Sequence, residues 1–163
     1  MKILILSLVL LFSTIVYSQD KIYIGIYQDP KLAVLSDDYG NKPYTLDIKA
    51  DVRLQGYQKK SYYYEMRVQY EYADLYGGKF SQWQIMGGWV LNKLIVDNFE
   101  IGVYPTIGLL HRFDSSWLSY GGTSEIAYNI GKFKIGWMQQ LINRPDVDKW
   151  GFSTYLGVAF NVK

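Results

Sequence analysis

The sequence predicts an all-β fold: an eight-stranded antiparallel up-and-down transmembrane β-barrel that follows a cleaved signal peptide. Three observations support this. Apolar and polar residues alternate with period two in eight segments after Asp20, the segments are long for strands, and one of their faces is rich in glycine. Period-two alternation indicates strands whose two faces meet different environments.

The N-terminal segment has the pattern of a signal peptide. Lys2 is the only charged residue before Asp20, and an apolar run extends over residues 3–16. This run is shorter than the roughly 20 residues that a spanning helix needs. Val16 and Ser18 suit the small-residue positions of a cleavage site before Gln19. We therefore expect a signal peptide over residues 1–18 and a barrel over residues 19–163, with an uncleaved N-terminal anchor as the alternative.

Composition excludes several classes of protein. The 49% of apolar and 17% of aromatic residues are typical of a folded chain. The formal charge of +2 is evenly spread, so no nucleic-acid partner is expected. Because the chain has no cysteine, it is neither a lipoprotein nor a disulfide scaffold. With His111 as the sole histidine, we expect no metal site and no cofactor.

The predicted strands follow one another with short connections. The second segment shows the clearest alternation, with apolar residues at the even positions of 44–54 and mainly polar ones at the odd positions of 45–55. The fifth contains Pro105, which is unusual inside a strand. The predicted strands cover residues 21–28, 44–55, 61–72, 82–91, 99–112, 118–130, 133–142 and 152–162.

The connections predict the orientation of the barrel. Those after the second, fourth and sixth strands centre on Gln58, Ile95 and Gly131. The connection after the first strand, over residues 29–43, is the longest. With eight strands both termini lie at one end, which in an outer-membrane barrel is the periplasmic end with the short turns. Surface loops are then expected at residues 29–43, 74–79 and 144–149.

Alternation alone does not say which face is inside, since a soluble lipocalin-like barrel turns its apolar face inward. Strands of about ten residues are the length needed to cross a bilayer at a tilt. Glycine weakens strands but suits a crowded interior, and it recurs on the polar face. Large aromatics also fall near the strand ends, where they would form interfacial belts. The expected outer belt is Tyr44, Tyr72, Trp83, Phe113, Tyr120 and Phe152, and the expected periplasmic belt is Tyr62, Phe99, Tyr128, Phe133 and Phe160.

The last strand carries the only motif-like element, Tyr155-Leu-Gly-Val-Ala-Phe-Asn-Val-Lys163. Through this strand and its architecture the mature chain resembles the small outer-membrane barrels of the OmpA/OmpX type, in the variety common among Bacteroidota. The resemblance implies the outer membrane of a Gram-negative bacterium, outer-membrane lipids and lipopolysaccharide as surroundings, and the secretion and barrel-insertion machinery as partners in biogenesis. The family usually ends on an aromatic residue, whereas Phe160 here is followed by three more residues. We expect a monomer.

The charges assigned to the barrel interior nearly cancel. Buried charges are tolerated when they pair, so a hydrogen-bonded plug is predicted rather than an open channel. The expected interior ion-pair network is Asp47, Lys49, Asp51, Arg53, Glu65, Arg67, Glu71, Glu100, Arg112, Glu125 and Lys134. Between the second and third strands, charge pairing predicts Arg53 opposite Glu65 and Asp51 opposite Arg67.

One segment contains the ingredients of nucleophilic catalysis. His111, Asp114 and Ser115 lie near the outer rim, and some eight-stranded outer-membrane barrels are lipid A acyltransferases or deacylases that use such residues. The match is only compositional, because the His-x-Ser strand motif of the deacylases is missing. Asp, Ser and Ser are also favoured turn residues. The sequence therefore favours a non-enzymatic role.

The predicted function is a structural or adhesive outer-membrane barrel with a packed, charge-balanced interior and surface loops for interaction. Three alternatives remain: a soluble periplasmic lipocalin-like binding barrel, a lipid A-modifying enzyme, and a phage-encoded barrel that blocks a receptor. A conduit for small apolar solutes also stays open. Nothing in the loops selects among these.

Overall fold

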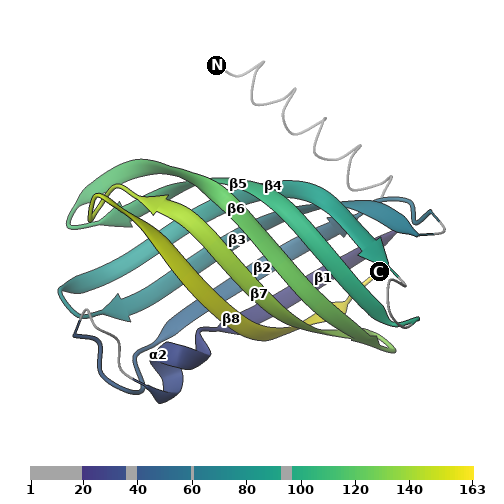
Figure 1. Ribbon diagram of the computed structural model, residues 1–163, viewed down its shortest axis with the longest axis horizontal. Coiled ribbons are helices and arrows are strands. Elements are labelled where there is room, and N and C mark those ends of the chain that lie inside the picture. Colours follow the sequence, from purple (N-terminus) through teal and green to yellow (C-terminus); the bar gives the residue numbers. More distant parts are fainter. Residues whose placement is uncertain (1–19, 36–39, 60, 93–96) are drawn as a thin grey trace.

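The computed structural model describes residues 20–35, 40–59, 61–92 and 97–163. The predicted signal peptide and the predicted turn at Ile95 lie outside these ranges. Eight strands and one short helix follow one another along the chain (Figure 1). The elements are β1 (Lys21–Gln28), α2 (Pro30–Val34), β2 (Asp47–Gln55), β3 (Tyr62–Leu75), β4 (Gly78–Asn92), β5 (Phe99–Arg112), β6 (Ser115–Ile130), β7 (Phe133–Arg144) and β8 (Lys149–Asn161).

The strands form a closed barrel in which each strand pairs with its neighbour in the sequence. The first and last strands also pair antiparallel, with Ile24 opposite Phe160. Closure removes the exposed edges that an open sheet would present. The predicted fold class, an eight-stranded antiparallel up-and-down barrel, is therefore confirmed.

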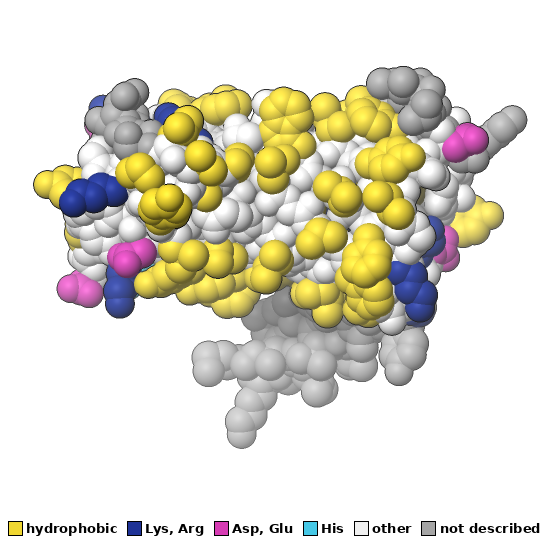
Figure 2. All heavy atoms as spheres, turned by 90° about the horizontal axis from the view of Figure 1, so that it is seen from below, with side chains coloured by type: hydrophobic (Ala, Val, Ile, Leu, Met, Phe, Trp, Pro, Cys, Tyr) yellow, Lys and Arg dark blue, Asp and Glu magenta, His cyan; other side chains and the backbone are white. Residues whose placement is uncertain are grey.

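Burial alternates along most of the strand residues, and the polar face is inside. On β2, Lys49 and Arg53 are fully buried, whereas on β1 the side chain of Ile26 is 58% exposed. Figure 2 shows hydrophobic side chains spread over the middle of the barrel and charged side chains gathered toward its two ends. A lipocalin-like barrel would have the reverse polarity, so burial contradicts that alternative.

Several strand boundaries differ from the prediction. β2 begins at Asp47, and Tyr44 lies outside it with a positive φ of 68°. The predicted loop at 74–79 is wrong, because β3 and β4 continue to a tight turn at Tyr76 and Gly77. Gly77 has a φ of 88°, a conformation that glycine adopts without the cost of a Cβ atom. The predicted loop was too long because the polar residues at its two ends belong to the strands.

Pro105 is accommodated inside β5 because the backbone ladder opens beside it. On the β4 side, Met86 pairs with Thr106 and Trp89 pairs with Val103, and the residues between are unpaired. Proline has no backbone N–H to donate to the adjacent strand. It is therefore tolerated where the hydrogen-bonded ladder is interrupted. On the β6 side Pro105 lies opposite Gly122.

The two ends of the barrel differ. At one end the chain leaves β1 at Asp29, whose Oδ1 accepts hydrogen bonds from the backbone N–H groups of Lys31 (2.7 Å) and Leu32 (3.1 Å) and so caps α2. Pro30 supplies the first helical residue. The C-terminus lies at the opposite end (Figure 1). No helix in the described ranges is both long enough and apolar enough to cross a membrane.

Candidate functional site

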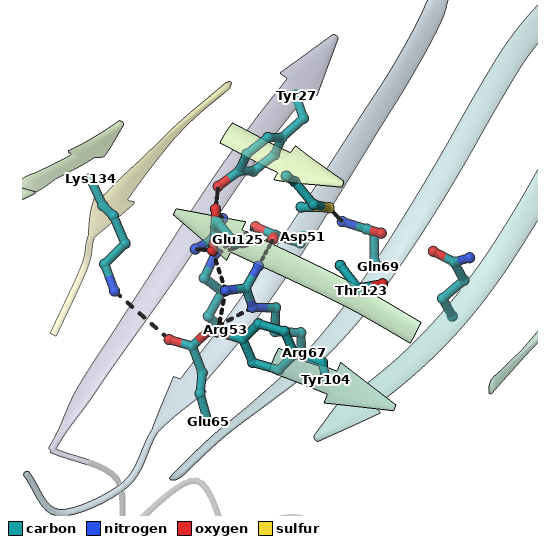
Figure 3. Close-up of polar contacts among 12 residues, drawn as sticks. Tyr27, Asp51, Arg53, Glu65, Arg67, Gln69, Tyr104, Thr123, Glu125 and Lys134 are labelled. Carbon is teal, nitrogen blue, oxygen red and sulfur yellow. Dashed lines mark hydrogen bonds and ion pairs between the residues drawn. The ribbon is translucent and has the colours of Figure 1, made fainter. Parts of the chain in front are cut away.

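The centre of the barrel holds a cluster of buried charges built from β2, β3 and β6. Glu125 accepts hydrogen bonds from the guanidinium groups of Arg53, whose Nη1 lies at 3.0 Å, and of Arg67. Asp51 Oδ2 accepts from Arg53 Nε at 3.0 Å, and the hydroxyl of Tyr27 donates to Glu125 at 2.6 Å. Figure 3 shows these side chains converging from facing strands. The five residues form one connected network.

A second group extends this cluster toward the end of the barrel that carries the C-terminus. Arg67 Nε donates to Glu65 at 2.6 Å, and the ammonium of Lys134 lies 2.9 Å from Glu100 and 3.8 Å from Glu65. The Tyr63 hydroxyl donates to Glu100 at 2.8 Å and accepts from Lys134. Tyr63 thus links a carboxylate to an ammonium inside the barrel.

A third group lies toward the end that carries α2. Lys49 Nζ is 3.0 Å from Glu71 and donates to the side-chain oxygen of Gln140. The Tyr155 hydroxyl donates to Glu71 at 3.0 Å and reaches Asp47 at 3.4 Å. Ten of the eleven predicted network residues therefore belong to the three groups.

Arg112 is the eleventh, and the structure places it apart from the others. It lies at the α2 end, where its Nη1 bonds Asp146 at 3.2 Å and Arg144 bonds the same carboxylate at 2.8 Å. Burial raises the pKa of the Asp146 carboxyl, but the hydrogen bonds and charges of Arg144 and Arg112 outweigh it and lower that pKa. The predicted ion-pair network did not include Asp146 or Arg144, because the sequence indicates only a turn at these positions.

The predicted register between β2 and β3 is wrong. Arg53 lies opposite Arg67, and Asp51 lies opposite Gln69. Two facing guanidinium groups are tolerated because Glu125 reaches them from β6, across the barrel. Charge pairing between adjacent strands could not reveal a partner on a distant strand.

Interior tyrosines were also missed. Tyr27, Tyr63, Tyr104 and Tyr155 are buried and bond charged groups, although each sits in the sequence as another aromatic strand residue. Their positions on the polar face of the alternation were the available signal. A tyrosine fills interior volume and offers a hydroxyl to a buried charge.

A cavity of about 540 Å³ opens at the α2 end. Its lining includes the buried charged residues Asp47, Glu71 and Arg112. It also includes the buried Leu32 of α2 and the exposed Trp150 of β8. Burial raises the pKa of Asp29, which also lines this cavity. This is where the described residues combine charged groups with space for a ligand.

The predicted aromatic belts lie mainly on the outer wall. Tyr72 and Phe99 are half-buried, whereas the other predicted members are exposed. Phe133 and Phe160 pack with ring centroids 5.2 Å apart at the end that carries the C-terminus. Trp89 and Trp150, which were not among the predicted belt residues, also make ring contacts. The ring centroids of Trp89 and Tyr62 are 5.7 Å apart, and those of Trp150 and Tyr120 are 5.9 Å apart.

The structure does not assemble the catalytic candidates. His111 Nδ1 lies 3.1 Å from the hydroxyl of Ser116, its cross-strand partner, on the outward face. Ser115 is the neighbouring residue in β6, so its side chain points to the other face of the sheet. Asp114 occupies a tight turn with a φ of 58°. Among the described residues there is also no group of three or more acidic, His or Cys side chains that could hold a metal.

Comparisons with known proteins identify the fold alone. No family model and no curated protein matches the chain. The solved structures that match include the outer membrane protein Ail of Yersinia pestis. This chain shares the fold of Ail. One is the structure of Ail in a phospholipid bilayer nanodisc, which has 16% sequence identity to this chain and a TM-score of 0.55. The match covers 86% of this chain and 98% of Ail. The crystal structure of Ail, the attachment invasion locus protein, gives 15% identity, 86% and 96% coverage, and a TM-score of 0.52.

Proposed function

We propose that this chain is a structural or adhesive β-barrel of a Gram-negative outer membrane, with a plugged interior and an interaction surface at its α2 end. The inverted polarity of the barrel carries the proposal. Ion-paired side chains fill the interior, and the outer wall exposes apolar residues such as Ile26, Leu109 and Phe152. Such an apolar wall is unfavourable in contact with water and favourable in contact with lipid tails.

We infer the orientation from the difference between the two ends of the barrel. Both mature termini face the periplasm, and residues 1–18 are removed as a signal peptide during secretion. α2 and the turn at 145–148 then face the outside, together with the tight turns of the other two hairpins at that end. Ail is an attachment invasion locus protein, and its likeness to this chain supports an adhesive role for these segments.

Cell fractionation tests the location. The full chain, expressed in a Gram-negative host, is expected in the outer-membrane fraction. Unheated protein should migrate faster than boiled protein on a denaturing gel, because the closed barrel resists unfolding by detergent. Recovery of the mature protein from the periplasmic soluble fraction would overturn the proposal.

An adhesion assay tests the role separately. Host cells displaying the wild-type barrel should bind matrix proteins or cultured cells more strongly than cells displaying a variant with residues 145–148 replaced by Gly and Ser. A matched control replaces Gly131 and Lys132, which form the turn at the opposite end. If both variants bind as the wild type does, the adhesive role of this turn is wrong.

A further inference from the structure

Three polar side chains form one row across the outer wall of β6, β7 and β8, which lie side by side in the barrel (Figure 1). Ser124 pairs with Gln139, and Gln139 pairs with Thr154 on the next strand. The row points outward, since Met138 and Gln140, on either side of Gln139, are buried inside the barrel. We call Ser124, Gln139 and Thr154 the polar row.

The polar row lies in the middle of the apolar wall rather than at a rim. Gln139 is in the middle of β7, and the outward-facing residues on its two sides, Trp137 and Leu141, are exposed. Other polar residues of the outer wall, such as His111 and Asn143, lie near strand ends. In a membrane, lipid tails would therefore surround the polar row, where water does not reach.

The polar row has unused hydrogen-bonding groups. Within the described part of the chain, none of its three side chains donates or accepts a hydrogen bond. All three residues are half-buried, so their polar atoms still reach the outer surface. A polar group in hydrocarbon without a partner is costly, because no water replaces the missing bond. Such groups in a membrane are typical of a contact with another protein surface.

A notch in the wall lies beside the polar row. Gly122 is exposed two residues before Ser124 on the same face of β6, and it pairs with Leu141. A Cβ atom placed on Gly122 would meet nothing within 4 Å. Small residues let two membrane-embedded surfaces approach closely, and polar side chains then bond across the contact. The outer wall combines both features here.

We propose that the polar row is the contact surface between two copies of this chain in the outer membrane. A two-fold axis along the membrane normal relates the copies, so both keep the same orientation in the bilayer. Gln139, the middle residue of the row, meets its counterpart at this axis. The inference rests on the proposed membrane location. It replaces the monomer expected from the sequence, in which the three residues are far apart.

The chemistry of the row favours a second copy, because the row is complementary to itself. The carboxamide of Gln139 has both N–H donors and an acceptor oxygen, so two such groups form a pair of N–H···O bonds across a two-fold axis. Its cross-strand neighbours, Ser124 and Thr154, have hydroxyl groups that both donate and accept. The row carries no charge, so like residues meet without repulsion. A lipid tail offers none of these groups.

Photo-crosslinking in the outer membrane tests the occupant. p-Benzoylphenylalanine replaces Leu141, which lies beside Gln139 on the outer face, so the polar row stays intact. Illumination should give an adduct with the mass of two chains. The same replacement at Ile85, an exposed residue of the outer wall on β4, is the matched control and should give no such adduct. An adduct at Leu141 with lipid only, or with a different host protein, would overturn the proposal.

Substitution of Gln139 tests the hydrogen bonds. Because the chain has no cysteine, Lys132→Cys allows labelling with donor and acceptor fluorophores at one site. Energy transfer in phospholipid vesicles is measured while lipid dilutes the protein. Gln139→Leu should move the midpoint to about tenfold higher protein density, because two hydrogen bonds across the axis are lost.

Tyr70→Phe is the matched control for Gln139→Leu. It removes a polar group from the outer face of β3, outside the polar row, and should leave the midpoint unchanged. An unchanged midpoint in Gln139→Leu would contradict the contact. This variant should fold, since leucine suits a lipid-facing position.

Heat-modifiable migration and fractionation are measured on the same samples. A barrel that folds in the outer membrane but gives neither the two-chain adduct nor energy transfer refutes the contact between copies and leaves the proposed membrane location intact. Recovery of the mature chain from the soluble fraction would contradict the location itself, and the inference with it.

Discussion

Glu125 holds two arginines that would otherwise face each other across β2 and β3. Its carboxylate accepts from Arg53 and Arg67, and both guanidinium groups are fully buried. Asp51 and Glu65 each neutralise one of them from the same strand. Removing the charge of Glu125 would weaken the acceptor that both guanidinium groups share inside the barrel, and breaking a buried ion pair by changing one partner costs more than the net stabilisation that the intact pair supplies.

We therefore expect Glu125→Gln to lower the free energy of unfolding by about 3–5 kcal/mol. Urea titration of the folded protein in micelles, followed by tryptophan fluorescence, measures the change. Asp114→Asn, an exposed carboxylate in a turn, is the control and should change stability little. Equal stability of the two variants would show that the central network is not held by this carboxylate.

Two adjacent glycines on β6 differ in the space around them. A Cβ atom on Gly121 would collide with the backbone oxygen of Leu141, whereas one on Gly122 would meet nothing within 4 Å. A strand backbone cannot move aside as a flexible side chain can.

Gly121→Ala should consequently destabilise the barrel by about 1–3 kcal/mol through overpacking. Gly122→Ala should be neutral or stabilise it by about 0.5 kcal/mol, since alanine has a less flexible unfolded state. Urea midpoints of the two single variants provide the comparison. Similar midpoints would mean that β6 and β7 are not packed as closely as the structure has them.

The β7–β8 hairpin is fastened by Asp146, the acceptor shared by Arg112 of β5 and Arg144 of β7. The lowered pKa of Asp146 means that its ionised form is favoured by folding. The contribution of Asp146 to the stability of the folded state is fully present above its ordinary pKa of 3.8. It is lost as the pH falls below that value through the lowered pKa of the folded state.

Hydrogen exchange of the backbone amides at 146–148, measured relative to an unstructured chain at the same pH, should accordingly show strong protection at neutral pH and lose it as the pH falls below about 3.8. In Asp146→Asn the turn should open readily at every pH, because the amide carries no charge to lose. A pH profile identical in the two proteins would assign the opening to another group.

The barrel as a whole places its apolar residues where a soluble protein would place charges. Ile107 is 52% exposed at mid-height on β5, and His111 is exposed nearer the end of the same strand. The cost of a lipid-facing charge depends on its depth in the bilayer.

In phospholipid vesicles Ile107→Arg should lower the free energy of unfolding by about 2–4 kcal/mol, and His111→Arg by about 0–1 kcal/mol. If the outer wall faced water, both substitutions would change stability by about 0.5 kcal/mol or less. Unfolding titrations in vesicles distinguish the two cases. A harmless arginine at Ile107 would contradict a lipid-facing wall.

The eight strands, the barrel class and the face of most strand residues could be predicted from the sequence, because alternation is a local property with a fixed period of two. Lys49, Arg53 and Glu125 were placed inside for the same reason. The register of β2 and β3 could not be predicted in this way, since closure fixes the stagger of all strands together. Closure also brings β6 opposite β2 and β3, so Glu125 meets Arg53 and Arg67 across the barrel. The different lengths of β1 and β8 likewise arise from pairing between the two ends of the chain.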